Sequence, residues 1–179
     1  MSMRPKRIIA LGLLLTAACG APLDGSVAQG ATTQNSSFTV SVQVQATCTI
    51  SAAPLAFPNP GALTANTDQS SQITIICTST TPYTVGLDNG LNFSGGTRRM
   101  KDTGAGTTFV NYGLYTDTGR TNAWTTTTST TTCTGGANSC AIGQGTGQSQ
   151  TINVYGRIPS QTAPAPATFQ DTVTATVTY

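Results

Sequence analysis

The chain has 179 residues, of which 8% are charged, and it contains eight Lys and Arg, six Asp and no His. This length accommodates an export leader and one domain with a real hydrophobic core. Three of the basic residues lie at positions 4, 6 and 7, so the rest of the chain is nearly neutral and has no basic run typical of nucleic-acid binding. The abundance of Thr, Ser, Gly, Ala and Val is typical of an all-β extracellular domain.

The N-terminus resembles a secretory signal peptide. A basic segment ends at Arg7, and an apolar segment too short to span a membrane follows from Ile8 to Ala18. Small residues at Ser26 and Ala28 suit signal cleavage, so we expect a signal peptide over residues 1–28, with the cleavage point between 18 and 31. Cys19 offers a lipoprotein alternative because two Ala precede it, although Thr stands where such signals usually have Leu.

The stretch Asn35–Ile50 alternates apolar and polar side chains. A period of two places all the apolar residues on one face of a strand. Two interpretations stay open: it is the first strand of the domain's own sandwich, or Phe38–Val44 is a strand offered to another molecule. The apolar positions are Phe38, Val40, Val42, Val44, Ala46, Cys48 and Ile50.

Four cysteines follow the leader, and an even count after an export signal predicts disulfides. Three pairings are compatible with four cysteines. We expect Cys48–Cys77, which would join two strand-like segments, and Cys133–Cys140, which would close a short Gly-rich loop. A metal site is disfavoured because the spacing is not CxxC and no His is available.

Short β-type segments and turn residues alternate through the remaining chain. The Pro-rich Ala52–Gly61 predicts an extended segment with Leu55 and Phe57 inward, and Ala62–Ser71 predicts a polar loop. Strands are predicted at Gln72–Thr78, Pro82–Leu87, Leu91–Phe93, Arg98–Lys101, Thr108–Asp117, Gln150–Ile158 and Phe169–Tyr179. The sequence Asp88-Asn89-Gly90 predicts a hairpin turn. This spacing of strands and turns indicates an Ig-like β-sandwich.

Three segments have more than one interpretation. The bases of Arg98–Lys101 are expected on a solvated strand, with a ligand patch as the alternative. Residues 118–148 form the longest irregular stretch, in which Trp124 either packs in the core or stacks on a sugar, and Thr125–Thr132 favours hairpin strands. The last strand places one apolar set on one face: Phe169, Val173, Ala175, Val177 and Tyr179.

No catalytic constellation is visible, because His and Glu are absent and most Asp lie in turns. We therefore expect no enzyme, no cofactor and no metal, and a function in binding or assembly. A sandwich lacking one strand would expose a groove that a partner's strand can fill. The donor side chains would each contribute about 1.5–3 kcal/mol, on the order of 10 kcal/mol together. Such a head-to-tail contact does not close, so it builds a filament.

In its order of motifs the chain resembles the spore coat protein U domain family, which includes pilin subunits of archaic chaperone–usher systems. The resemblance covers most of the chain beyond the leader. Its pieces are the opening strand with Cys48-Thr49-Ile50, Leu55-Ala56-Phe57, Ile75-Ile76-Cys77-Thr78, Pro82-Tyr83-Thr84, Arg98-Arg99-Met100, Tyr112–Asp117, Trp124, Gly156-Arg157-Ile158-Pro159 and Phe169–Tyr179. Pro58-Asn59-Pro60 departs from the Gly often found there, and the Cys133–Cys140 loop resembles an addition.

The resemblance implies an incomplete Ig-like sandwich, with residues 29–46 as an N-terminal donor-strand extension and 47–179 as the domain. Phe38, Val40, Val42 and Val44 would enter a neighbouring subunit, and the last strand would border the acceptor groove. A periplasmic chaperone and an outer-membrane usher are the implied partners, and the implied route leads through the periplasm to a surface fibre. The alternative is a secreted spore-coat or carbohydrate-binding module that acts as a monomer.

Overall fold

The computed structural model describes residues 30–127, 129–136 and 138–179, so the expected signal peptide and Cys19 lie outside the described residues. The described part consists of strands and turns and contains no helix that could cross a membrane. The strands are β1 (Cys48–Ala52), β2 (Thr67–Cys77), β3 (Pro82–Leu87), β4 (Arg98–Asp102), β5 (Phe109–Tyr115), β6 (Ala141–Gln144), β7 (Ser149–Ile158), β8 (Phe169–Gln170) and β9 (Ala175–Thr178).

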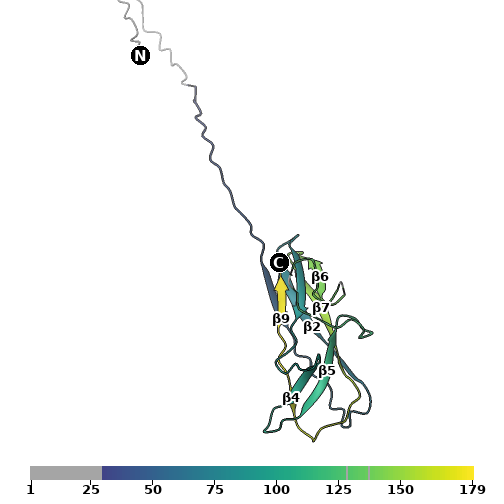
Figure 1. Ribbon diagram of the computed structural model, residues 1–179. Coiled ribbons are helices and arrows are strands. Elements are labelled where there is room, and N and C mark those ends of the chain that lie inside the picture. The colour runs from purple at the N-terminus through teal and green to yellow at the C-terminus, as the bar shows by residue number, and fades with distance from the viewer. Residues whose placement is uncertain (1–29, 128, 137) are drawn as a thin grey trace, which may run out of the picture. The chain divides into compact units, whose positions relative to one another are not determined.

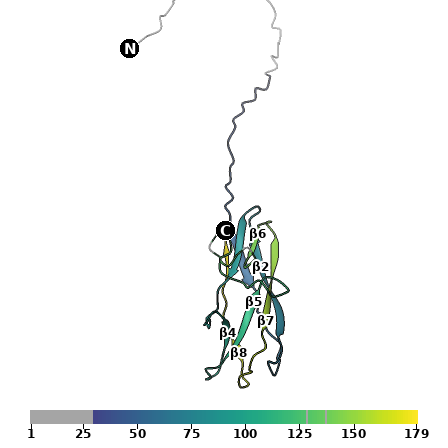
Figure 2. The same cartoon turned by 45° about the vertical axis from the view of Figure 1, so that its right-hand side comes forward.

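All of these strands lie in one compact unit, Val42–Tyr179, and the described residues 30–41 belong to a separate unit. A larger sheet has the order β1-β2-β7-β5-β4-β8, and a smaller sheet has the order β6-β3-β9 (Figures 1 and 2). Every strand pair is antiparallel. The all-β, sandwich-type fold predicted from strand spacing is confirmed.

Period-two patterning places the core where the sequence predicts it. In β2, Ile73, Ile75 and Cys77 are at most 2% exposed, whereas Ile76 faces outward and is 46% exposed. Strands β3, β5 and β7 contribute the other walls of the same cluster. Its further buried apolar members are Leu63, Tyr83, Val85, Leu87, Val110, Tyr112, Leu114, Trp124, Cys140, Val154 and Ile158.

The loop predicted at Ala62–Ser71 is wrong, because β2 already begins at Thr67 and Leu63 is buried. The polar first half of β2 pairs with β7 in register, from Thr67 opposite Ile158 onward. An ion pair supports this pairing: the Arg157 guanidinium donates to both carboxylate oxygens of Asp68 at 2.7 and 2.8 Å. Backbone pairing and a cross-strand charge pair thus extend β2 into residues whose sequence shows no apolar alternation.

The hairpin predicted around Asp88-Asn89-Gly90 is also absent from the described strands. Gly90 does take a left-handed turn, at φ 79°. However, Leu91–Phe93 forms no strand, and β3 pairs instead with β6 and β9. Strand β6 lies within residues 118–148, where hairpin strands were expected only at Thr125–Thr132. Sequence reasoning missed β6 because it has only four residues and one of them is Gly.

Arg98 is buried, which contradicts the expected solvated strand. Strand β4 lies between β5 and β8, and the Arg98 side chain is only 7% exposed. Its guanidinium donates to the carbonyl oxygens of Leu87, Asp88 and Trp124. Through these hydrogen bonds the buried guanidinium links the end of β3 to the interior. It does not lie on the solvated strand that was expected from the sequence.

Both expected disulfides are confirmed. Cys48 lies directly opposite Cys77 in the β1–β2 ladder and is bonded to it, and Cys133 is bonded to Cys140. Trp124 is 1% exposed and belongs to the core, as the first of its two interpretations predicted. Its ring therefore presents no open face on which a sugar could stack.

Candidate functional site: a groove between open strand edges

Two strand edges of the domain face each other without a strand between them. Strand β1 ends the larger sheet, and β9 ends the smaller one, so each has one paired neighbour. Their residues lie side by side (Figure 1). Counting antiparallel pairs from β1 to β8 shows that the C-terminal strand runs opposite to β1.

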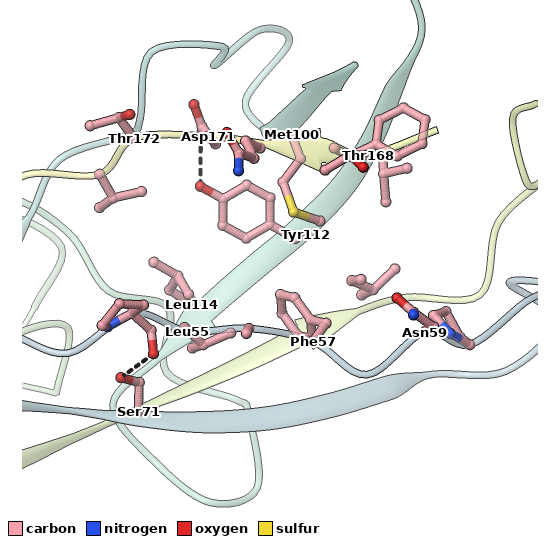
Figure 3. Close-up of a pocket in the computed structure, with 18 of the residues that line it drawn as sticks. Leu55, Phe57, Asn59, Ser71, Met100, Tyr112, Leu114, Thr168, Asp171 and Thr172 are labelled. Atoms are coloured by element: carbon pink, nitrogen blue, oxygen red, sulfur yellow. Dashed lines mark hydrogen bonds between the residues drawn. The ribbon is translucent and has the colours of Figure 1, made fainter. Parts of the chain in front are cut away.

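Beyond β1 and β9 the two edges bound a groove of about 1050 Å³, here called the acceptor groove. One wall is formed by residues 52–63 and the other by residues 163–175 (Figure 3). The floor is apolar and consists of core side chains; except for Met100, they are at most 7% exposed. Its main side chains are Leu63, Ile73, Leu87, Met100, Val110, Tyr112, Leu114, Val154 and Ile158.

The first wall is extended chain that contributes side chains to the core and leaves its backbone open. Leu55 and Phe57 pack against the core as predicted, over Gly156, where a Cβ would lie 2.9 Å from each of them. The Ser71 hydroxyl holds the wall by donating to the carbonyls of Ala53 and Pro54 at 2.7 and 3.1 Å. Within the described chain, the backbone groups of Leu55 and Phe57 make no hydrogen bond.

The second wall differs from the continuous strand predicted at Phe169–Tyr179. It is interrupted between β8 and β9, at residues 171–174. There the carbonyls of Thr172 and Thr174 accept hydrogen bonds from Leu91 N–H and Asp88 N–H, and Thr174 N–H donates to the Asp88 carboxylate. Val173 lies between these two attachments, and its backbone groups have no partner among the described residues. Strand alternation turns them toward the open edge.

A partly buried carboxylate fixes this interruption of the second wall. Asp171 accepts a 2.7 Å hydrogen bond from the Tyr112 hydroxyl, and it accepts from both the backbone and the side-chain amide of Asn92 (Figure 3). Burial and the adjacent Asp171 carboxylate raise the pKa of Tyr112, so its hydroxyl stays protonated as the donor. Gly90 allows the close approach, because a Cβ there would overlap the Asp171 carboxylate.

We expect Asp171→Ala to lower the free energy of unfolding by about 2–4 kcal/mol, because it leaves the Tyr112 hydroxyl and the Asn92 amide without their charged acceptor. Chemical denaturation measures this loss. Asp171→Asn keeps an acceptor oxygen and should cost less. In a double-mutant cycle, Tyr112→Phe should be much less costly in the Asp171→Ala background. Additive losses would contradict the described contact.

Acid should weaken the groove wall through Asp88. Burial raises the pKa of this carboxyl, but hydrogen bonds from the backbone N–H groups of Thr174 and Gly90 outweigh it and hold the pKa below 3.8. A pKa lowered by folding adds stability above the unfolded value, and that stability is lost as the pH falls through the folded value. The Arg157 hydrogen bond lowers the pKa of Asp68 in the same direction.

The free energy of unfolding should therefore be flat near neutral pH and decline as the pH falls through and below about 4. Asp88→Asn keeps the acceptor oxygen but not the titration, so its unfolding curve should depend less steeply on pH. Denaturant titrations at pH 3, 4, 5 and 7 measure both slopes. Equal slopes for the two proteins would contradict the role of Asp88.

The predicted site residues fall into two sets, one in the last strand and one in the extension. Phe169, Val173 and Ala175 line the acceptor groove; Val177 packs against the core outside the lining, and Tyr179 is half-exposed. The extension residues Phe38, Val40, Val42 and Val44 are 75–89% exposed, and residues 30–47 form no strand. Four large apolar side chains in water are unusual and mark an interaction segment.

Sequence reasoning missed the polar residues that shape the groove. Asp88 and Asp171 looked like ordinary turn and strand residues, and Arg98 looked solvated. Their spacing along the chain carries no signal, since they meet only in the folded domain. Among the described residues, no group of three or more His, Cys, Asp or Glu side chains could hold a metal ion.

Comparison with solved structures finds a chain with a similar fold. One chain from a complex of Acinetobacter baumannii, described as the CsuC–CsuE chaperone–tip adhesion subunit pre-assembly complex of archaic chaperone–usher Csu pili, matches with a TM-score of 0.55 and 24% identity. The match covers 76% of this chain and 40% of that chain, so this chain spans less than half of it. At this identity the match supports the fold alone.

A second solved chain, from a chaperone–tip adhesin complex of CFA/I fimbriae biogenesis, has a TM-score of 0.35 and 11% identity over 70% of this chain and 38% of that chain. This likeness is too slight to support an argument. Among curated protein sequences, none is significantly similar to this chain. A family model, the Spore Coat Protein U domain, matches residues 34–176. The chain therefore belongs to the Spore Coat Protein U domain family.

Proposed function

We propose that this chain is a structural subunit of a surface pilus assembled by the chaperone–usher route, and that it polymerises by donor-strand complementation. In this proposal residues 29–46 are the donor extension and residues 47–179 are the acceptor domain. The role is mechanical and involves no catalysis. The observation that carries the proposal is the acceptor groove, which combines an apolar floor with unpaired backbone on both walls.

Both features of the groove need a strand to satisfy them. Unpaired N–H and C=O groups at Leu55, Phe57 and Val173 are what an added strand hydrogen-bonds. The apolar floor takes every second side chain of such a strand. No small polar ligand would satisfy both an apolar floor and two extended backbone edges at once.

The extension has the length and pattern of that strand. From Phe38 to Val44 its four apolar residues recur at every second position over about 20 Å of extended chain. Their burial supplies on the order of 10 kcal/mol before ordering costs, and backbone pairing adds to it. The polar residues between them would face outward, where Ser, Thr and Gln remain hydrated.

The fixed root of the extension sets the direction in which it could enter a groove. The extension enters β1 at Cys48, and its root is tied down by Thr47 N–H to the Thr78 hydroxyl and Thr78 N–H to the Thr47 carbonyl, at 3.2 and 2.9 Å. If the extension folded back into the groove of its own domain, the extension would run opposite to β1. It would therefore run parallel to the C-terminal strand. A neighbour's extension can enter in the other direction, antiparallel to the C-terminal strand and parallel to the wall that continues β1.

The proposed partners are neighbouring subunits, a periplasmic chaperone that covers the groove before assembly, and an outer-membrane usher. The proposed route is export by the signal peptide, transit through the periplasm and display in an extracellular fibre. Support comes from the family, the disulfides expected of an oxidising compartment, and the printed description of the similar Csu chain as part of a chaperone–subunit complex.

The test is to express the chain with its chaperone and usher and run the product in SDS without boiling. The intact chain should give a ladder of polymers that collapses to monomer on boiling. Deletion of Ala31–Gln45 should abolish the ladder and leave chaperone binding unchanged. A ladder-free monomer from the intact chain would overturn the proposal and favour the monomeric coat or sugar-binding module.

A further inference from the structure

The outer face of the smaller sheet is covered, although it has no third sheet to pack against. In β3 the side chains of Tyr83, Val85 and Leu87 face the core, so Thr84 and Gly86 face the other way. Thr84 is nevertheless fully buried, and all of β3 after Pro82 is buried. Something in this chain therefore shields the outer face of β3 from water.

The cover is the start of residues 125–140, here called the threonine loop. The Thr84 hydroxyl donates to the carbonyl of Ser129 at 2.5 Å, and Leu87 N–H donates to the carbonyl of Thr125 at 3.0 Å. The loop lies so close to Gly86 that an added Cβ would be 2.7 Å from the Thr127 backbone nitrogen. Glycine at position 86 is thus what admits the loop to this face.

The threonine loop also reaches the strand that forms the open edge. The Thr127 hydroxyl lies 3.1 Å from the Thr178 hydroxyl, and Thr178 pairs with Thr84 across β3 and β9. Strand β9 has one paired neighbour, so this contact is a second attachment, made through its outer face. The contact lies outside the groove lining, which includes only Ala175 of β9.

Both ends of the threonine loop are fixed. Trp124, which precedes it, is buried in the core. Within it, Thr125 N–H donates to the Ser139 carbonyl at 2.7 Å, and the Cys133–Cys140 disulfide closes the far side, where Cys140 is buried. A loop anchored in this way can hold a neighbouring strand in place.

We propose that the threonine loop braces β9, and that Thr127 is a positioning residue that holds β9, and with it the groove wall that ends at Ala175, in place for an incoming donor strand. This inference rests on the proposed function. A strand that is held before binding pays less ordering cost when a partner adds to its edge. The loop thus acts from the back of the sheet and leaves the groove itself free.

Two variants test the brace in the full-length chain. Gly86→Ala places a Cβ where the loop lies, and Thr127→Val removes the hydroxyl while keeping the side-chain shape. Each should raise amide hydrogen exchange in Ala175–Thr178, by about two- to tenfold for Thr127→Val, and leave exchange in β5 unchanged. Each should also lower the temperature at which the SDS-resistant ladder collapses.

Thr131→Val is the matched control, because among the described residues the Thr131 hydroxyl has a hydrogen-bond contact only with Ser129 of the same loop, and it should change neither readout. One contrary result is that the wild-type chain forms a ladder while Gly86→Ala and Thr127→Val keep its collapse temperature and its amide exchange in β9. That result would overturn the brace alone. Absence of a ladder from the wild-type chain would instead overturn the proposed function and with it the brace's role in assembly.

Discussion

Val42→Asp should abolish polymer formation. The substitution removes about 1.5–3 kcal/mol of apolar burial and would place a carboxylate in an apolar groove with no counter-ion, at a cost of several kcal/mol. Together these effects weaken each subunit contact by more than a thousandfold, since 1.4 kcal/mol corresponds to a factor of ten. The measurement is the unboiled SDS ladder together with electron microscopy of surface fibres.

Gln43→Asp is the matched control for this change. It introduces the same charge one residue away, where strand alternation turns the side chain out of the groove. This variant should still assemble, because its carboxylate stays in water. Equal loss of polymer in both variants would mean that charge in the extension, and not burial of its apolar face, prevents assembly.

Replacing Cys48 and Cys77 together by Ser should give the largest loss of domain stability. The bond closes a loop with a sequence separation of 29, for which the chain-entropy relation gives about 3.5 kcal/mol. Cys77 is buried in the core as well, so a Ser hydroxyl there adds a desolvation cost. For a domain of this size the expected fall in Tm is about 7–14 °C.

The Cys133→Ser, Cys140→Ser pair provides the comparison. Its sequence separation is only 7, and the same relation gives about 2.5 kcal/mol. Thermal unfolding followed by circular dichroism under oxidising conditions measures both losses. A smaller loss for the 48–77 pair than for the 133–140 pair would contradict the described role of Cys48–Cys77 at the root of the extension.

The patterned parts of this fold could be predicted from the sequence. Strict alternation in β2 identifies Ile73, Ile75 and Cys77 as core residues. The strand predicted at Pro82–Leu87 has the same bounds as β3. Cysteine count and local spacing gave both disulfides. The core strands could be predicted because a period of two is visible within one short stretch, and the disulfides because only four cysteines follow the leader.

The groove walls could not be predicted in the same way, because they depend on contacts between distant segments. Asp171 interrupts the last strand by bonding Tyr112 and Asn92, which are 59 and 79 residues away in sequence. Arg98 is buried because carbonyls from three other positions converge on it. Polar residues of this kind look like surface residues until the tertiary fold supplies their partners.

Residues Phe38–Val44 posed the opposite difficulty. Their alternation predicts a strand, yet the described chain forms none there and leaves the apolar side chains exposed. In the proposed function, the pattern is satisfied when another molecule supplies the sheet. A local conflict between pattern and structure of this kind is typical of a functional segment.

Photo-crosslinking tests that account most directly. Benzoylphenylalanine is placed at Val42, fibres are irradiated, and the crosslinked peptides are identified by mass spectrometry. Crosslinks from one subunit to residues 52–57 or 168–175 of a different subunit, shown with mixed isotope labels, are the predicted result; the same probe at Gln43 should give few of them. Crosslinks confined to one chain, or to surfaces outside the acceptor groove, would contradict donor-strand complementation.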